Sequence, residues 1–211
     1  MGSIKYHLGC GSNYLQGYVN VDFPPKDHNV NFNIKADLYT DILKMKLKKC
    51  DEIRSHHFFE HHNFYDTFVL LHNWAQALNK DGTLIIDVPD LEALCKAYLL
   101  ADKNKKFLVK RYLFGSHEAH WAYHINGWCQ DSLSTLMNDL GFQITNIHKY
   151  GDINEAQPNC GITLTFKKTE NKSSQETQDV LIHYLSLYKN GDTEFENSLF
   201  EFFVKEFKSK I

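Results

Sequence analysis

Short apolar runs and longer amphipathic segments alternate through the first two thirds of the chain. Runs rich in β-branched and aromatic residues predict strands at Ile4–Leu8, Tyr18–Asp22, Val30–Ala36, Asp51–Ser55, Thr83–Val88, Phe142–Tyr150 and Ile162–Phe166. Apolar residues at every third or fourth position predict helices at Phe64–Leu78, before a turn at Lys80–Gly82, and at Leu91–Leu100. A further helix is predicted to begin at a cap formed by Asp131 or Ser132, and to end at Leu140 before Gly141.

The order of these elements indicates an α/β fold built on a mostly parallel sheet. Residues 9–17 are all that separate the first two predicted strands, whereas a crossover between parallel strands needs about a dozen residues or more. We therefore expect a first helix of one or two turns, around Asn13–Gln16. The complete prediction is a Rossmann-like, seven-stranded sheet with helices on both faces.

The last 43 residues differ in pattern from the rest. Residues 169–179 contain no apolar side chain and are predicted to be a linker. The core domain is thus expected to span residues 1–168. Residues 180–211 are expected to form a helical extension with helices at Val180–Lys189 and Glu194–Ile211.

The second helix of this extension carries an apolar stripe, formed by Phe195, Leu199, Phe202, Phe203 and Phe207. An isolated helix would leave these side chains in water, which is unfavourable for a contiguous apolar surface. Two arrangements would cover them. The stripe can fold back on its own domain, or it can pair with a second chain; we favour the second, a homodimer through the C-terminal helices.

Composition and charge exclude several classes of partner. The chain has 211 residues and a formal net charge of −3, so a whole-surface electrostatic attraction to nucleic acid is not expected. Neither an export signal nor a run of roughly 20 apolar residues is present, so no membrane partner is expected. Five widely spaced cysteines without a C-x-x-C pair favour a reduced, cytoplasmic protein. A small-molecule partner fits these features better than a polymer.

Glycine and polar residues follow several predicted strands directly. Gly9 and Gly11 follow the first strand, Asp22 ends the second, and Asp37 follows the third. Open α/β sheets bind ligands at the carboxyl ends of their strands. Glycine allows close approach to a ligand there, and a carboxylate can accept hydrogen bonds from both hydroxyls of a ribose.

These residues closely resemble the class I S-adenosylmethionine-dependent methyltransferases, in particular a compact bacterial branch with a shortened first helix. The resemblance covers about Lys5 to Lys167. Its motifs are His7-Leu-Gly-Cys-Gly11, Gly17-Tyr-Val-Asn-Val-Asp22, Ala36-Asp37-Leu38, Glu60-His61, Leu78-Asn-Lys-Asp-Gly-Thr-Leu84 and Val88-Pro-Asp90. It implies a Rossmann-like fold, S-adenosylmethionine as cofactor and S-adenosylhomocysteine as product.

The resemblance also implies a cofactor site residue by residue. Gly9, Cys10 and Gly11 would lie under the methionine, Asp22 with Phe23 would hold the ribose, Asp37 with Leu38 the adenine, and Ser55 with His56 would face the methionine ammonium group. Many relatives have an acidic residue where this chain has His7. A nicotinamide dinucleotide fold is the alternative, but the third glycine of G-x-G-x-x-G is replaced by Tyr14.

Seven of the 12 histidines lie in two short stretches. His57, Glu60 and His61 have the i, i+3, i+4 spacing that places side chains on one helical face, where they could bind a divalent metal. Ubiquinone-pathway and small-RNA 3′-end methyltransferases resemble this stretch, with a metal-binding Glu-x-x-Glu-His. Here His57 replaces the first Glu, and a structural role without metal is favoured.

The second stretch, Ser116–Trp128, is expected to overhang the sheet edge as the substrate wall. Unperturbed imidazole titrates near pH 6.5, so His57, His120 or His124 can accept a proton from an acceptor hydroxyl. A structural, hydrogen-bonded role is the alternative for each of them. The basic residues Lys103, Lys105, Lys106, Lys110 and Arg111 form either a solvated helix face or a mouth that attracts an anionic acceptor.

We thus expect a methyltransferase, and methyl transfer to oxygen. The resemblance to enzymes of cell-surface carbohydrate pathways implies a sugar, a sugar nucleotide or a phosphorus oxyacid derivative as acceptor. The alternative is a non-catalytic subunit that binds an adenosyl ligand or assists assembly.

Overall fold

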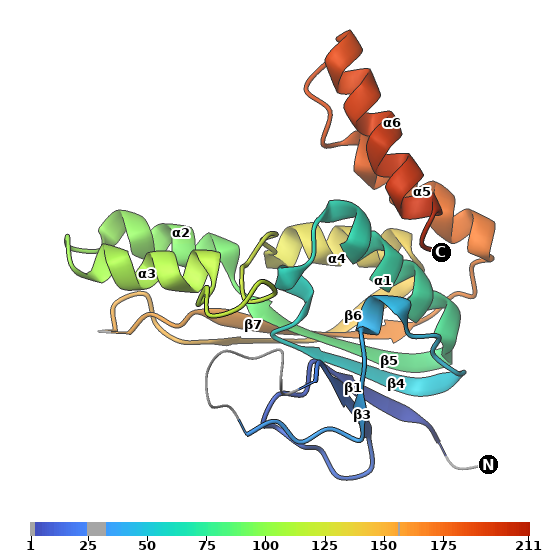
Figure 1. Cartoon of the computed structure of the whole chain (residues 1–211), viewed down its shortest axis with the longest axis horizontal. Coiled ribbons are helices and arrows are strands. Elements are labelled where there is room, and N and C mark those ends of the chain that lie inside the picture. The colour runs from blue at the N-terminus through green and yellow to red at the C-terminus, as the bar shows by residue number, and fades with distance from the viewer. Residues whose placement is uncertain (1–2, 25–32, 156) are drawn as a thin grey trace.

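A seven-stranded sheet forms the centre of the molecule in the computed structural model, which describes residues 3–24, 33–155 and 157–211 (Figure 1). The strands are β1 Lys5–Leu8, β2 Val19–Asp22, β3 Leu38–Tyr39, β4 Cys50–His56, β5 Leu78–Pro89, β6 Phe142–Tyr150 and β7 Gly161–Lys168. Their spatial order is β3-β2-β1-β4-β5-β7-β6. Strand β7 runs antiparallel to β5 and β6, and the other pairings among the described strands are parallel. The predicted α/β fold with a mostly parallel sheet is confirmed.

Among the described residues, six α-helices and two short 3-10 helices accompany the sheet. They are η2 Ile42–Lys44, η3 Phe59–His61, α1 Phe64–Ala77, α2 Leu91–Leu100, α3 Lys105–Phe114, α4 Gln130–Asp139, α5 Ser174–Ser186 and α6 Glu194–Lys208. Within the described residues, no helix combines the length and the apolar character that crossing a bilayer requires.

The α-helices all lie on one side of the sheet (Figure 1). Within the described residues, the predicted helices are therefore confirmed on this face of the sheet. The connections after β1 and β2 would supply helices to the other face. The first of them, residues 9–18, contains turns closed by Asn13 N–H to Cys10 O and Tyr18 N–H to Leu15 O, and the expected helix at Asn13–Gln16 does not form. Too few residues separate the two strands for a complete helix.

The core lies between the sheet and helices α1 and α4. Alternate residues of the strands, such as Ile53 of β4, Leu84 and Ile86 of β5 and Leu164 of β7, point toward the helices and are fully buried. Lys168 is also buried. Its ammonium group donates to the carbonyls of Ala75 and Leu78 at 2.6 and 2.8 Å, and these hydrogen bonds offset the cost of burying it. It thereby satisfies acceptors at the end of α1 that the helix itself leaves open.

The third predicted strand is misplaced. Residues 30–32 of Val30–Ala36 lie outside the described residues, and residues 33–36 are not in a strand. Instead, β3 pairs Leu38 with Val21 and Tyr39 with Asp22. Asp37 therefore precedes β3 instead of following it.

Other boundaries shift by a few residues. Cys129, and not Asp131 or Ser132, is the N-cap of α4, with Ser132 bonding back to it. The predicted turn at residues 80–82 is taken into β5, with Asp81 at a φ of 67°. Gly141 does end the α4 segment, at a φ of 85°.

The C-terminal extension begins earlier than predicted. Helix α5 starts at Ser174, inside the predicted linker 169–179, because Ser173 and Glu176 form a capping box. Helices α5 and α6 both pack against α1. Phe207 of α6 is fully buried, whereas Phe195 and Phe202 stay exposed. The molecule thus covers part of the stripe itself, and the homodimer stays a prediction.

Candidate functional site

A cavity of about 690 Å³ lies at the carboxyl ends of β1, β2 and β4, where ligands bind to open α/β sheets. The residues that line it include the turn after β1, the ends of β2 and β4, the segments that follow β3 and β4, and the loop of residues 115–124 that follows α3. Of the residues predicted to bind the cofactor, Gly9, Cys10, Gly11, Asp22, Phe23 and His56 line this cavity, as do His57, His120 and His124 of the predicted catalytic group. Asp37, Leu38 and Ser55 do not.

The turn after β1 depends on its glycines, which adopt left-handed backbone conformations. Gly9 has a φ of 70°, and a Cβ at this position would lie 2.5 Å from the Cβ of Phe58. Gly11 also has a positive φ, and its N–H donates to Asp22 Oδ2 at 2.6 Å. Burial and the negative charge of Asp22 raise the pKa of the Cys10 thiol to about 12, so this cysteine is an uncharged part of the wall.

Asp22 is the acidic group of this end of the cavity. Its Oδ1 accepts from the N–H of Phe23 at 2.7 Å, while Oδ2 binds the turn. Carboxylate oxygens accept hydrogen bonds from hydroxyl groups such as those of a ribose. The ring of Phe23 stacks on Trp121, with centroids 6.5 Å apart, and thereby connects β2 to the loop of residues 115–124.

The carboxylate of Asp37 accepts hydrogen bonds from nearby residues of the chain in this structure. Its Oδ2 accepts from the backbone N–H and the side-chain amide of Asn20, and its Oδ1 accepts from the Tyr14 hydroxyl at 2.8 Å. Asp41, which follows β3, lies in the cavity wall near Asp22. Sequence reasoning did not select Asp41 because it placed the end of this strand before Asp37.

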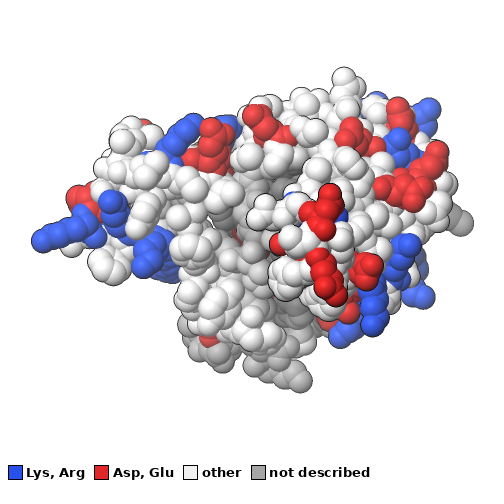
Figure 2. Space-filling view, turned by 90° about the horizontal axis from the view of Figure 1, so that it is seen from above, with Lys and Arg blue, Asp and Glu red and all other residues white. Residues whose placement is uncertain are grey.

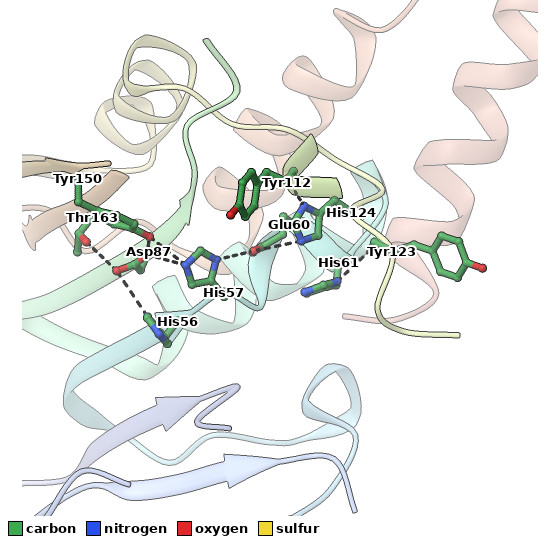
Figure 3. Close-up of polar contacts among 10 residues, drawn as sticks. All are labelled: His56, His57, Glu60, His61, Asp87, Tyr112, Tyr123, His124, Tyr150 and Thr163. Carbon is green, nitrogen blue, oxygen red and sulfur yellow. Dashed lines mark hydrogen bonds and ion pairs between the residues drawn. The ribbon is translucent and has the colours of Figure 1, made fainter. Parts of the chain in front are cut away.

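His57 lies between two carboxylates (Figure 3). Its Nδ1–H donates to Glu60 Oε1 at 3.1 Å, and its Nε2 lies 2.9 Å from the Tyr150 hydroxyl oxygen. Since Tyr150 donates its own proton to Asp87 at 2.7 Å, the Nε2 of His57 must carry a proton too. His57 is therefore an imidazolium in this arrangement and has no lone pair with which to accept a proton.

The ionisation of these groups agrees with that assignment. Burial disfavours protonated His57, but the hydrogen bond to Glu60 and the charges of Glu60 and Asp87 outweigh it and raise the pKa of His57. Burial likewise disfavours ionised Asp87, but hydrogen bonds from His56, Thr163 and Tyr150 lower the pKa of Asp87 to about 2. Both carboxylates are thus charged near neutral pH.

His61 and His124 lie on the other side of Glu60 (Figure 3). Each donates its Nδ1–H to a backbone carbonyl, His61 to Tyr123 and His124 to Tyr112, both at 3.0 Å. The neutral form of each ring therefore has its lone pair on Nε2. Burial lowers the pKa of His124, which favours that neutral form.

Backbone hydrogen bonds hold the two histidine-bearing segments together. The carbonyl of Glu60 accepts from the N–H groups of Ile125 and Asn126, at 2.9 and 3.1 Å. The loop of residues 115–124 is therefore attached to η3 at the point where Glu60 and His61 lie. This attachment fixes His124 relative to both residues, although they are distant in sequence.

Several residues of the site were missed in the sequence. Asp87, Tyr150 and Thr163 belong to β5, β6 and β7, and they meet only because these strands are neighbours in the sheet. Arg111 lines the cavity, whereas Lys103, Lys105, Lys106 and Lys110 of the same basic run do not. Basic side chains gather at the end of the molecule formed by α2 and α3 (Figure 2).

Neither a family model nor a curated protein matches this sequence. Solved structures do match the fold. A S-adenosylmethionine-dependent methyltransferase from Methanosarcina mazei has a TM-score of 0.52 at 13% identity, over 80% of this chain and 94% of that one. A putative methyltransferase from Haloferax volcanii, in complex with the activator Trm112, has a TM-score of 0.51 at 13% identity, over 80% and 84% of the two chains.

Magnesium protoporphyrin IX methyltransferase from Synechocystis PCC 6803, solved with bound S-adenosylhomocysteine, has a TM-score of 0.50 at 14% identity, over 79% of this chain and 74% of that one. At such low identity, the likeness concerns the fold. The strand order, the antiparallel β7 and these neighbours agree: the chain has the class I S-adenosylmethionine-dependent methyltransferase fold.

Proposed function

We propose that this protein is a S-adenosylmethionine-dependent methyltransferase that acts on an oxygen atom of a small polar acceptor. The observation that carries the proposal is the cavity itself. Its wall contains both the glycine turn with Asp22 and the histidine-bearing loop of residues 115–124. A cofactor and an acceptor can therefore meet in one enclosure.

The cofactor fits the sheet end of the cavity. Gly9 and Gly11 line the cavity where the methionine would lie, and Asp22 offers a charged acceptor for the ribose hydroxyls. The solved structure of the Synechocystis enzyme, which shares the fold, contains S-adenosylhomocysteine. The contribution of Asp37 and Leu38 to adenine binding, and of Ser55 and His56 to the ammonium group, remains a prediction.

The acceptor would occupy the loop end of the cavity. Arg111 is exposed there and can pair with an anionic group. A sugar, a sugar nucleotide or a phosphorus oxyacid derivative combines an oxygen nucleophile with hydroxyl or anionic groups that Arg111 and the histidines can bind. This acceptor class rests on that chemistry and on the sequence resemblance.

In the proposed reaction, an acceptor oxygen attacks the methyl carbon of the sulfonium. The carbon–oxygen bond forms as the carbon–sulfur bond breaks, and its electron pair stays on sulfur to give S-adenosylhomocysteine. His120, an exposed imidazole in the cavity wall, takes the hydroxyl proton. Holding the two reactants in line supplies much of the acceleration, since orientation is worth about 7–11 kcal/mol.

Incubation with S-adenosylmethionine labelled in the methyl group tests this proposal. Fractionated small metabolites, including sugars, sugar nucleotides and phosphorus oxyacids, serve as acceptors, and mass spectrometry locates the label. Transfer to an oxygen is the expected result. Tight binding of S-adenosylhomocysteine without transfer to any fraction would instead support the non-catalytic, adenosyl-binding alternative.

Cofactor binding is expected to depend on the charge of Asp22. The variant Asp22→Asn keeps the size of the side chain but loses one charged acceptor, and a hydrogen bond to a charged group is worth roughly 1.5–3 kcal/mol. We expect the Kd for S-adenosylhomocysteine, measured by calorimetry, to rise about 10–100-fold. Unchanged affinity in a folded variant would remove Asp22 from the cofactor site.

Arg111 is expected to affect acceptor binding and not cofactor binding. The variant Arg111→Ala should raise the KM for an anionic acceptor up to about fivefold, since an exposed ion pair contributes at most about 1 kcal/mol. Lys110→Ala is the matched control, because Lys110 neighbours Arg111 but does not line the cavity. Equal effects of the two variants would indicate general attraction by the basic run.

A further inference from the structure

We propose that Glu60, His61 and His124 form a binding site for one divalent transition-metal ion, of the class that includes Zn²⁺. One carboxylate oxygen and two imidazole nitrogens of these residues lie within 4.8 Å of one another. The sequence pattern suggested His57 as a ligand, but its ring nitrogens face Glu60 Oε1 and the Tyr150 hydroxyl. The ligand that replaces it, His124, comes from the loop of residues 115–124.

Glu60 gives the first reason for an ion at this place. Its side chain is 1% exposed, and its Oε2 has no hydrogen-bond partner among the described residues. Three imidazoles, those of His57, His61 and His124, lie around this carboxyl group. A buried carboxyl oxygen without a partner is costly, and a cation would stabilise it.

The two histidines give the second reason. Their Nδ1–H groups are held by the carbonyls of Tyr123 and Tyr112, which leaves each Nε2 available as a ligand. Metal-bound histidines in proteins have this outer hydrogen bond, which fixes the tautomer and orients the ring. The Nε2 of His124 lies 3.9 Å from Glu60 Oε1. Donor atoms around a tetrahedral zinc ion are about 3.4 Å apart, so closure on an ion needs movements on the order of 1 Å or less.

The donor set also indicates the kind of ion. Two imidazoles and one carboxylate suit zinc and other late transition metals, whereas Mg²⁺ prefers oxygen ligands alone. Three protein ligands leave a coordination position open. His61 and His124 line the cavity, so this position faces the space assigned to the acceptor. The metal site is inferred from the geometry alone. A catalytic role for the ion rests on the proposed function: the ion would lower the pKa of the acceptor hydroxyl, and His120 would take the proton.

Metal binding can be measured without cofactor or acceptor. Protein freed of metal by chelation is incubated with Zn²⁺ or with Co²⁺, and bound metal is quantified by inductively coupled plasma mass spectrometry after gel filtration. The visible spectrum of the Co²⁺ protein reports its coordination. We expect about one ion per chain and a Co²⁺ spectrum typical of nitrogen and oxygen ligands.

The variants Glu60→Gln and His124→Ala should weaken this binding by more than the roughly 10–100-fold that loss of an outer-shell partner costs. His120→Ala, in the same cavity, and His183→Ala, on the exposed surface of α5, should leave it unchanged. Circular dichroism and S-adenosylhomocysteine affinity show whether each variant is folded. Absence of bound ion in the wild type, or equal binding in His124→Ala, would overturn the site. Metal binding without methyl transfer would overturn only the proposed function.

Discussion

Replacement of His120 by Ala is expected to lower kcat about 10²–10⁴-fold, the usual contribution of a positioned general base. Affinity for S-adenosylhomocysteine should stay the same, because His120 belongs to the loop of residues 115–124 and not to the glycine turn or to Asp22, where the cofactor is proposed to bind. Of the three histidines that sequence analysis selected, His57 carries two protons already, and His124 points its free nitrogen toward Glu60. His120 is the one whose ring is exposed in the cavity.

A neighbouring histidine provides the matched control for this variant. His117 lies on the same loop, but its Nε2 is bonded to the Phe114 carbonyl at 2.8 Å and its ring stacks on Tyr123. His117→Ala should therefore change kcat far less. Added imidazole should restore part of the activity of His120→Ala, since it can enter the space that the side chain leaves. Loss without rescue, or equal loss in both variants, would contradict the role of His120 as proton acceptor.

The parts of the fold that could be predicted from sequence are those with strong local patterns. Helix α2 has the predicted bounds, and α1 ends one residue before its predicted end, because apolar periodicity identifies an amphipathic helix. Strand β3 was misplaced because it has two residues, both exposed, and its position is set by pairing with β2. No alternation of apolar and polar residues can mark so short a strand.

The candidate site likewise contains residues that could be predicted from sequence and residues that could not. Gly9, Gly11 and Asp22 could be placed from sequence, because each directly follows or ends a strand whose position was predicted correctly. The role of His57 could not be predicted. Its protonation depends on Tyr150, which is distant in sequence. The pairing of β6 with β7 brings Tyr150 to His57. The same holds for Glu60 and His124, whose proximity results from backbone hydrogen bonds made by the loop.

Stability toward acid should depend on two buried histidines, His7 and His62. His7 is fully buried on β1, where its Nδ1–H donates to Asn20 Oδ1 at 3.1 Å and its Nε2 has no partner among the described residues. His62 packs against the ring of Phe58 at 4.5 Å, also with an unpartnered Nε2. Burial disfavours the charged form and lowers the pKa of both His7 and His62 to about 4.

The sign of the effect follows from these pKa values. Between pH 6.5 and 4 the unfolded chain binds protons at both histidines and the folded chain does not, so the free energy of unfolding falls as the pH falls. Each shift of about 2.5 units corresponds to about 3 kcal/mol, so the two histidines together account for about 6 kcal/mol, which is comparable to the whole stability of a typical domain. The raised pKa of His57 acts above pH 6.5 and does not offset this loss.

Urea unfolding at a series of pH values from 7.5 to 4.5 measures the effect. We expect the wild-type protein to lose up to about 1.4 kcal/mol per pH unit for each of the two histidines below pH 6. Each of the variants His7→Gln and His62→Gln removes one of these groups. The slope of the free energy of unfolding against pH should therefore fall by the contribution of one histidine in each variant, even where the variant is less stable than the wild type at pH 7.5. His183→Gln, on the exposed surface of α5, should reproduce the wild-type profile. A wild-type stability that stays constant from pH 6.5 to 4.5 would show that these histidines are protonated in the folded protein, because only then do the folded and unfolded chains bind equal numbers of protons.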